Sequence, residues 1–197
     1  MANPWKRTLI ALHFNYKRNR FNTKKGHKLE ESGLKNHPPF RTIEGYPDRI
    51  DSTAIIVRLL DGLGYRFYWA SEGLSLEDCS YKITPEAKST GQIIEHIWGL
   101  VNWMCIYLLG EESTRPSAYE EMRISILENI KRIRDRFNVM DSSDLEKLEI
   151  EKHPFWHYIN GPISDALTHV GQINILRRYS GNPPIKAHVF SGDEPIL

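Results

Sequence analysis

Two segments in the first half of the chain repeat apolar residues at steps of three and four, the spacing that places side chains on one face of an α-helix. The first segment follows Asp51 or Ser52, either of which can cap a helix. The second opens with "STGQ" at Ser89–Gln92, which has the form of a capping box, and Gly110 is placed to close it. The stripes that these helices should bury are Ile56, Leu60, Leu63, Phe67, Ala70 and Leu74, and Ile93, Ile97, Leu100, Met104 and Leu108.

Two further segments show the same period in the second half. The third helix is expected to begin near Thr114, with Pro116 in its first turn, where a missing N–H costs nothing. After an interruption at "MDSSDLEKLEI", the fourth should begin at Pro162, with Asn160 or Gly161 as its cap, and end at "SGNPP". The expected buried stripes are Tyr119, Met122, Ile126, Ile130, Ile133 and Phe137, and Ile163, Ala166, Val170 and Ile173.

Four amphipathic helices and almost no strand signal predict an all-α protein. An antiparallel or cytokine-like four-helix bundle is the natural way to bury four apolar stripes. We expect this domain over residues 51–197, after an irregular, basic N-terminal extension over residues 1–50 that holds eleven Lys and Arg against four Asp and Glu. The tail "KAHVFSG" could add a short strand, but nothing obvious pairs with it.

The composition limits the partners that we expect. Hydrophobic residues make up 40% and charged residues 26%, as in ordinary globular proteins, and the formal net charge of +1 predicts no strong attraction to nucleic acid. Residues 1–28 could form a basic arm for nucleic acid, but a solvated extension is the better interpretation, because neither an RNA-binding signature nor a recognition helix accompanies them. We therefore expect no nucleic-acid partner.

The apolar run and the cysteines indicate a cellular compartment. The longest near-apolar run, from Ile97 to Leu109, has 13 residues, whereas roughly 17–25 are needed to span a bilayer, so we expect a buried helix and no membrane partner. The two cysteines, Cys79 in an expected loop and Cys105 inside that run, cannot form a disulfide framework. With no convincing signal peptide, the chain is expected in the cytoplasm.

A candidate metal site lies on the second and fourth helices. Asp165 and His169 are four residues apart, so their Cβ atoms should lie about 5–6 Å from each other on one helical edge. His96 borders the inward face of the second helix, where an imidazole that loses water needs a partner. Three protein ligands with an open position for water are typical of catalytic zinc, and two histidines with a carboxylate also suit iron, nickel or manganese.

Two other interpretations of the histidines remain open. His169 and Asp165 could be an ordinary hydrogen-bonded pair that fixes the helix register or a dimer interface, with no metal and no catalysis. His153 and His157 also stand four apart, but Pro154 discourages a helix there, so we expect them in a loop at the mouth of a pocket.

The same residues resemble the DinB/YfiT-like family of metal-dependent four-helix-bundle proteins. The resemblance rests on "TGQIIEHIWGLVNW", on "DGLGYRFYWASEGL" and above all on "NGPISDALTHVGQINILRRYSGNP", in which a His precedes Gly-Gln near the middle of the last helix. It covers about Asp51 to Pro183. The family's usual ligands are three histidines; His96 and His169 match two of them, and Asp165 stands at the third position.

This resemblance implies an enzyme that is hydrolase-like or that transfers a low-molecular-weight thiol such as bacillithiol or mycothiol. A divalent metal, zinc or nickel before iron or manganese, would activate a water or thiol nucleophile. We expect a small-molecule substrate and a homodimer. Glu95 would be a second-layer partner or base, and Gln172 would line the pocket together with aromatic side chains drawn from Trp98, Trp69, Trp156, Trp103 and Tyr65. Arg177 and Arg178 should offset the dipole of the last helix.

Overall fold

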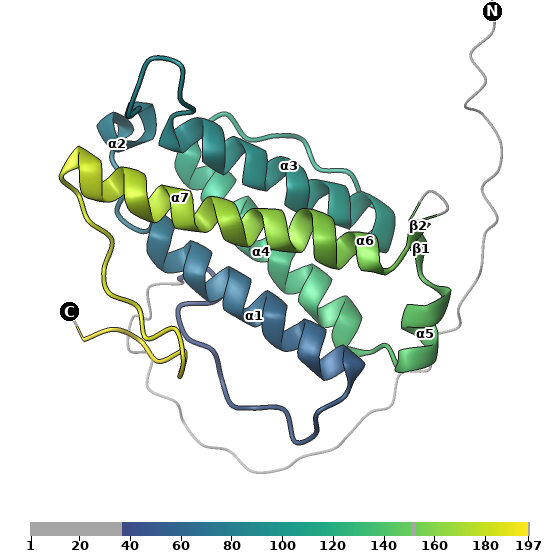
Figure 1. Ribbon diagram of the computed structural model, residues 1–197. Coiled ribbons are helices and arrows are strands. Elements are labelled where there is room, and N and C mark those ends of the chain that lie inside the picture. Colours follow the sequence, from purple (N-terminus) through teal and green to yellow (C-terminus); the bar gives the residue numbers. More distant parts are fainter. Residues whose placement is uncertain (1–36, 151–152, 197) are drawn as a thin grey trace, which may run out of the picture. The chain divides into compact units, whose positions relative to one another are not determined.

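The computed structural model describes residues 37–150 and 153–196, and within them the chain is mostly α-helical, as predicted. Four helices are long: α1 (Ser52–Ser71), α3 (Thr90–Leu109), α4 (Tyr119–Asn138) and α7 (Ser164–Ser180). α3 packs against both α4 and α7, and α1 packs against the same two helices (Figure 1). Each long helix therefore has two long neighbours, and the core lies between them.

Short elements complete the chain. They are α2 (Leu76–Ser80), α5 (Ser142–Lys147), α6 (Trp156–Tyr158), a π-helical turn η1 (Ile159–Ile163), and strands β1 (Glu149–Ile150) and β2 (His153–Pro154), which pair antiparallel with each other. The tail after α7 forms no strand up to residue 196. None of the described helices has both the length and the apolar character needed to cross a bilayer.

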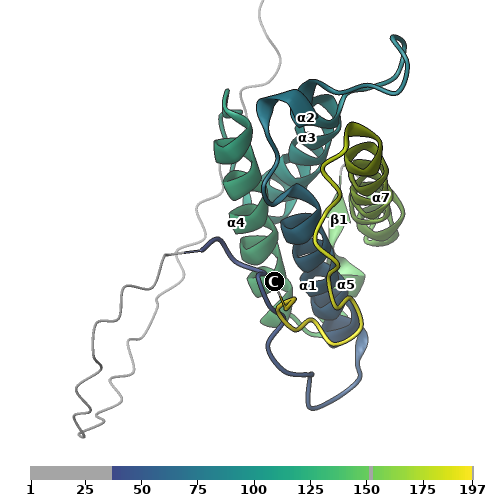
Figure 2. The same cartoon turned by 90° about the vertical axis from the view of Figure 1, so that its left-hand side faces the viewer.

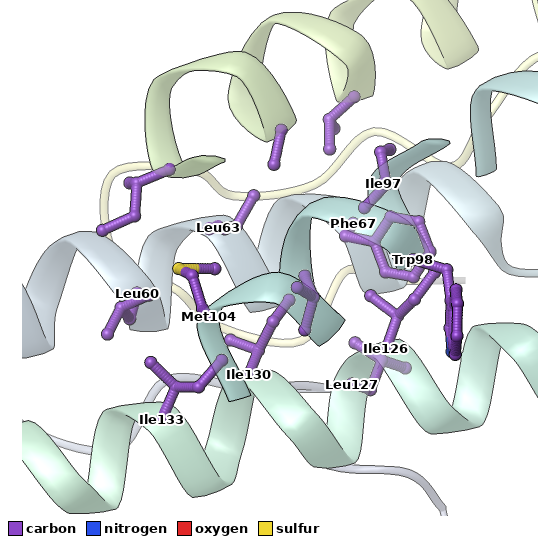
Figure 3. Close-up of a cluster of buried hydrophobic side chains, with 14 of the residues drawn as sticks. Leu60, Leu63, Phe67, Ile97, Trp98, Met104, Ile126, Leu127, Ile130 and Ile133 are labelled. Atoms are coloured by element: carbon purple, nitrogen blue, oxygen red, sulfur yellow. The ribbon is translucent and has the colours of Figure 1, made fainter. Parts of the chain in front are cut away.

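Most residues of the predicted stripes form the core, but Tyr119 is 36% exposed and Leu100 is only partly buried. Leu60, Leu63 and Phe67 from α1 meet Ile97 and Met104 from α3, and all are fully buried (Figure 3). The same is true of the residues that α4 contributes, which are Ile126, Leu127, Ile130 and Ile133. Burial of one such side chain is worth about 1.5–3 kcal/mol. The helix caps predicted at Asp51 and Ser89 are also confirmed. The Asp51 carboxylate accepts from the Ala54 N–H, and Ser89 forms its capping box with Gln92.

Three expectations about helices were wrong. The helix expected from Thr114 begins at Tyr119, because the segment before it is tied to α3 by the Ser113 N–H, which donates to Asn102 Oδ1 at 3.0 Å. α1 ends at Ser71, so Leu74 is not part of its stripe. The interruption at "MDSSDLEKLEI" contains α5, whose first turn is capped by Asp141 and Asp144.

α2 is also absent from the sequence-based prediction, which placed Cys79 in a loop. Cys79 lies in α2 and is buried. Residues 1–36, which include the proposed basic arm, lie outside the described part of the chain. Residues 37–50 contain neither helix nor strand, and the boundary at residue 50 stays a prediction.

Asp78 joins α2 to the end of α7. Its buried carboxylate accepts hydrogen bonds from the Ser75 N–H and hydroxyl, from Ser180 Oγ at 2.8 Å and from Asn182 Nδ2 at 2.7 Å. Burial alone would raise the pKa of Asp78, but the bonds from Asn182, Ser75 and Ser180 outweigh burial and hold it well below its usual value. The ionised carboxylate is thus the form that the fold stabilises.

Arg177 holds the same end of α7 to α1. The guanidinium is almost fully buried and donates to the backbone carbonyls of Ala70 at 3.0 Å and Glu72 at 2.8 Å, at the C-terminus of α1. A cation at that end is favourable for the α1 dipole, so Arg177 offsets the dipole of the neighbouring helix. Gly181 then ends α7 in the left-handed region, with φ 89°.

We predict that Asp78→Ala lowers the free energy of unfolding by about 2–4 kcal/mol at pH 7, because it removes a buried charged acceptor and leaves its donors unpaired. Because the pKa of Asp78 is depressed in the folded state, its stabilisation is present above the unfolded value of about 4 and is lost as the pH falls below it. Urea unfolding should therefore show the difference between wild type and variant narrowing from pH 7 to pH 3. The control Glu77→Ala, at the exposed neighbour, should change the free energy by less than about 0.5 kcal/mol.

Candidate metal centre

α3 brings His96 to the edge that faces α7. His96 follows Ile93 by three residues and precedes Ile97, both of which are buried, whereas its own side chain keeps 37% of its surface exposed. It therefore lies at the border of the core, half open to solvent. The rigid capped start of α3 fixes its position along the helix.

α7 supplies the other two side chains. Asp165 lies in the first turn of α7, where the helix dipole favours a negative charge, and its side chain is 43% exposed. His169 lies one turn later on the same edge and is 12% exposed, so it is the innermost of the three. Before α7, the backbone leaves the helical region at Gly161, and Pro162 is the first residue after this break.

The three side chains meet across the interface of α3 and α7. His96 Nε2 lies 3.1 Å from Asp165 Oδ2, and His169 Nε2 lies 3.4 Å from Asp165 Oδ1. The two imidazole rings pack edge to face, with centroids 4.6 Å apart and planes at 85°. The carboxylate of Asp165 thus has one imidazole nitrogen beside each of its oxygens.

Gln172 contacts the Nδ1 side of the His169 ring. Gln172 Oε1 lies 2.7 Å from His169 Nδ1, and with the amide in this orientation the Nδ1–H of His169 donates to it. In a neutral imidazole, Nε2 then presents a lone pair towards the Asp165 carboxylate. A cation placed between these two acceptors, either a proton or a metal ion, would bind to both. A second-layer bond of this kind is what orients histidine ligands in metal sites.

The geometry suits a small divalent ion. Zinc holds nitrogen and oxygen ligands at about 2.0–2.2 Å, which in a tetrahedron separates the ligand atoms by about 3.3–3.5 Å. One ligand atom from each of His96, Asp165 and His169 can be chosen so that all lie within 4.8 Å of one another. The contacts of 3.1 and 3.4 Å from the two histidines are to different oxygens of the Asp165 carboxylate. Among the described residues, no other group of three or more His, Cys, Asp or Glu side chains is arranged in this way.

The contact between Asp165 and the histidines adds little to stability without an ion. Asp165 and His96 are both more than one third exposed, and exposed ion pairs contribute about 0–1 kcal/mol. The core holds α3 and α7 in place, with Ile97 from α3 and Ala166 and Ile173 from α7 all fully buried.

A cleft of about 700 Å³ gives access to the centre. Its wall from α3 includes Trp103 and Leu100, and it is also lined by the polar residues Asn160 from η1 and Thr168 from α7. His96 and Asp165 line it, whereas His169 lies behind them. Such a volume accommodates a small-molecule ligand. The cleft is thus partly apolar, partly polar, and open at the candidate metal position.

Glu95 lines the same cleft and forms an ion pair with Arg115. Arg115 belongs to the segment between α3 and α4, and its exposed ion pair with Glu95 keeps a carboxylate one residue before His96 at the cleft. The buried thiols do not contribute a nucleophile. Burial raises the pKa of Cys79 and of Cys105 to about 11, which keeps both as neutral thiols.

The other side chains expected at the pocket lie elsewhere. Trp98 is in the core, where its indole N–H donates to Ser125 Oγ at 3.2 Å (Figure 3). Trp69 lines a different cleft, between α1 and α7. Trp156 is 66% exposed and lines a third, beside α5. Gln172 does not line the cleft and instead binds His169 from the side, as described above.

His153 and His157 are not at the mouth of this cleft. Their rings stack on each other, with centroids 4.3 Å apart and planes at 12°, and His153 lies in β2 while His157 lies in α6. The sequence patterns did not single out Gly99 or Thr168, although both lie three residues from a candidate ligand on the same helical edge. That spacing is the signal that could have identified them.

Comparison with known proteins identified no relative of this chain. Searches of protein-family models, of curated proteins and of solved structures found no match to the chain.

Proposed function

We propose that this protein is a metal-dependent enzyme of the DinB/YfiT-like type, in which His96, Asp165 and His169 hold one divalent cation. The observation behind the proposal is the meeting of three ligand side chains from two helices at the wall of an open cleft. Catalytic metal sites use three protein ligands and leave a position open for water or substrate, and an open cleft is what such a position requires.

The arrangement of helices supports the DinB/YfiT-like type. In a four-helix bundle each helix has two neighbours, and metal ligands project inward from facing helices. α1, α3, α4 and α7 have that pattern of contacts, and the candidate ligands come from the neighbouring helices α3 and α7, at the edge of the core. The assignment to this family rests on this pattern and on the three sequence motifs.

The ligand set favours zinc or nickel, and iron or manganese are also compatible with it. Two imidazole nitrogens and one carboxylate oxygen suit borderline divalent metals, and the described cysteines are too far from the set to add a soft ligand. When bound, such a cation supplies a Lewis acid that makes a water or thiol nucleophilic near neutral pH.

The chain's own residues define what the substrate meets. Trp103 and Leu100 offer an apolar wall, and Asn160 and Thr168 offer hydrogen bonds on the opposite side. Glu95, held by Arg115, places a carboxylate where it can accept a proton from the nucleophile. We propose a small substrate and, as nucleophile, water or a low-molecular-weight thiol. A cytoplasmic location and a homodimer belong to the same proposal.

The second candidate function is a non-catalytic helical module in which Asp165 binds both imidazoles. The 3.1 Å contact between His96 Nε2 and Asp165 Oδ2 favours it, since this contact needs no metal ion. The two functions differ in what removal of Asp165 should do to the metal-free protein and to metal binding.

We predict that wild-type protein without a His tag binds about one Zn²⁺ or Ni²⁺ per chain, and that Zn²⁺ raises its Tm because only the folded state assembles the ligands. His169→Ala should weaken binding at least tenfold and remove the Tm shift. The metal content is measured by elemental analysis after gel filtration. The Tm shift is measured by thermal unfolding with and without Zn²⁺. His157→Ala, which changes a paired histidine outside the set, should keep both properties; a wild type that takes up no metal would exclude the proposal.

We predict that Asp165→His binds Zn²⁺ at least as tightly as wild type, because it restores three imidazoles, whereas Asp165→Ala binds at least tenfold more weakly. In the metal-free form, Asp165→Ala should lower the free energy of unfolding by less than about 1 kcal/mol, as expected for a half-exposed pair. Zn²⁺ titration and urea unfolding test the two statements. A larger loss of stability, with no difference in Zn²⁺ affinity among the three proteins, would support the non-catalytic module.

We predict that Gly99→Leu reduces turnover at least tenfold while Zn²⁺ binding is unchanged. Gly99 lines the cleft, and a Cβ there meets no other atom within 4 Å, so a leucine would fill the cleft without disturbing the helix. Turnover is measured with zinc-loaded protein on 4-nitrophenyl acetate, and on 1-chloro-2,4-dinitrobenzene with bacillithiol or mycothiol. The matched control is Gly62→Leu on α1, which has equal room but lies outside this cleft and should keep full activity. Equal loss in both variants would show that the cleft is not the substrate site.

A further inference from the structure

A second cleft lies on the other side of α7, between α7 and α1. It has a volume of about 490 Å³ and is covered by residues 184–189 of the tail. The chain after α7 runs back along α1 (Figures 1 and 2). Leu167 and Val170 of α7 line this cleft, whereas Asp165 and His169 face α3. We call it the basic cleft, after its three charged residues, Arg66, Arg178 and Lys186.

All the charged side chains that line the basic cleft are positive. Arg66 comes from α1, Arg178 from α7 and Lys186 from the tail, and no Asp or Glu is among the residues that line it. None of these three cations forms an ion pair with any residue of the described ranges. Arg178 donates one hydrogen bond to the Asn174 carbonyl at 2.8 Å, whereas Arg177 is buried, donates to two carbonyls of α1 and has a structural role. Cations from three separate elements therefore surround one concave space without a counter-charge.

The floor of the basic cleft is apolar. Trp69 and Val170 line it and are 3% and 2% exposed, and Ile185 adds an apolar contact from the tail. The indole N–H of Trp69 donates to the Arg41 carbonyl at 3.1 Å, which fixes the ring. A ligand in this space would meet apolar surface below and positive charge at the rim.

The cover of the basic cleft is fastened to α1. The hydroxyl of Tyr65 accepts from the His188 N–H at 2.9 Å and donates to the Asp193 carbonyl at 2.6 Å. The Ile43 N–H donates to the Gly192 carbonyl at 2.9 Å. The cleft is thus bounded on three sides by secured chain, so that its shape is preorganised for a ligand.

We infer that the basic cleft binds a small organic anion, a molecule that carries a carboxylate, sulfonate or phosphate group on an apolar body. Arginine side chains bind such groups through two parallel N–H donors, and like charges around a concave space attract an anion more strongly than any one of them alone. The apolar body would lie against Trp69 and Val170. This inference is independent of the proposed metal centre, because the two sites share no residue.

The test uses naphthalene-2-carboxylate as probe and the uncharged naphthalene-2-carboxamide as its isosteric control. We expect calorimetric titration of the wild type to give at least tenfold tighter binding of the carboxylate. The ¹⁵N-labelled indole N–H of Trp69, assigned with Trp69→Phe, should shift in the NMR spectrum on addition of the carboxylate. Equal affinity for the two probes, or an unmoved Trp69 signal, would overturn the inference.

Two kinds of variant locate the binding. Arg66→Gln combined with Arg178→Gln should reduce carboxylate affinity to that of the amide, whereas Arg136→Gln, the same change at an exposed position of α4, should leave it unaltered. Gly171→Leu should abolish binding of both probes, since Gly171 lines the cleft and a Cβ there meets nothing within 4 Å. Its Tm should not fall, because leucine is the better helix former. Unchanged binding in either variant contradicts the inference.

Discussion

The carboxylate of Asp165 lies between two imidazoles from different helices, and the functional interpretation depends on that arrangement. Asp165 and His169 are neighbours because of helix geometry alone, but His96 reaches them only because α3 packs against α7. Gln172 engages the Nδ1 side of the His169 ring, and the Nε2 atom faces the carboxylate. The site therefore has a place for a cation, and the cleft beside it gives access to solvent and substrate.

α7 has to be held firmly for these side chains to stay together, and polar contacts at its C-terminal end do much of that. Arg177 donates to the last carbonyls of α1, and Asp78 accepts from Ser180 and Asn182. These buried groups lie at one end of α7, while Asp165 lies near the other end beside the break at Gly161. The candidate site is thus close to the less regular end of the helix.

The sequence predicted local features well and long-range ones poorly. The capping box of Ser89 and Gln92 and the stripes of the long helices follow from spacing within one segment, and the structure contains them. The start of α4 does not follow from local spacing. It depends on contacts with another helix, because Ser113 is bonded to Asn102 of α3 and Tyr119 packs against Gly91 of α3. α2 and α5 were missed because their capping boxes use Asp78 and Asp144 in place of the usual Glu or Gln.

In the candidate site, too, the local features were predicted and the long-range ones were not. The spacing of Asp165 and His169 was enough to pair them, but the choice among tryptophans was not determined by spacing. Trp98 turns towards α4 and into the core, whereas Trp103, seven residues after His96, stays on the edge that lines the cleft. Which of two aromatic residues on one helix meets a ligand depends on the neighbouring helix, and that neighbour is not visible in the helix's own sequence.

X-ray absorption of the zinc-loaded protein at the zinc edge tests the central claim most directly, because it reports the atoms around the ion without any assumption about activity. The account predicts two imidazole nitrogens at about 2.0–2.1 Å, seen by their outer-ring scattering, and one carboxylate oxygen at about 2.0–2.2 Å with solvent at the remaining position. A shell of oxygen atoms alone, without imidazole scattering, would contradict it.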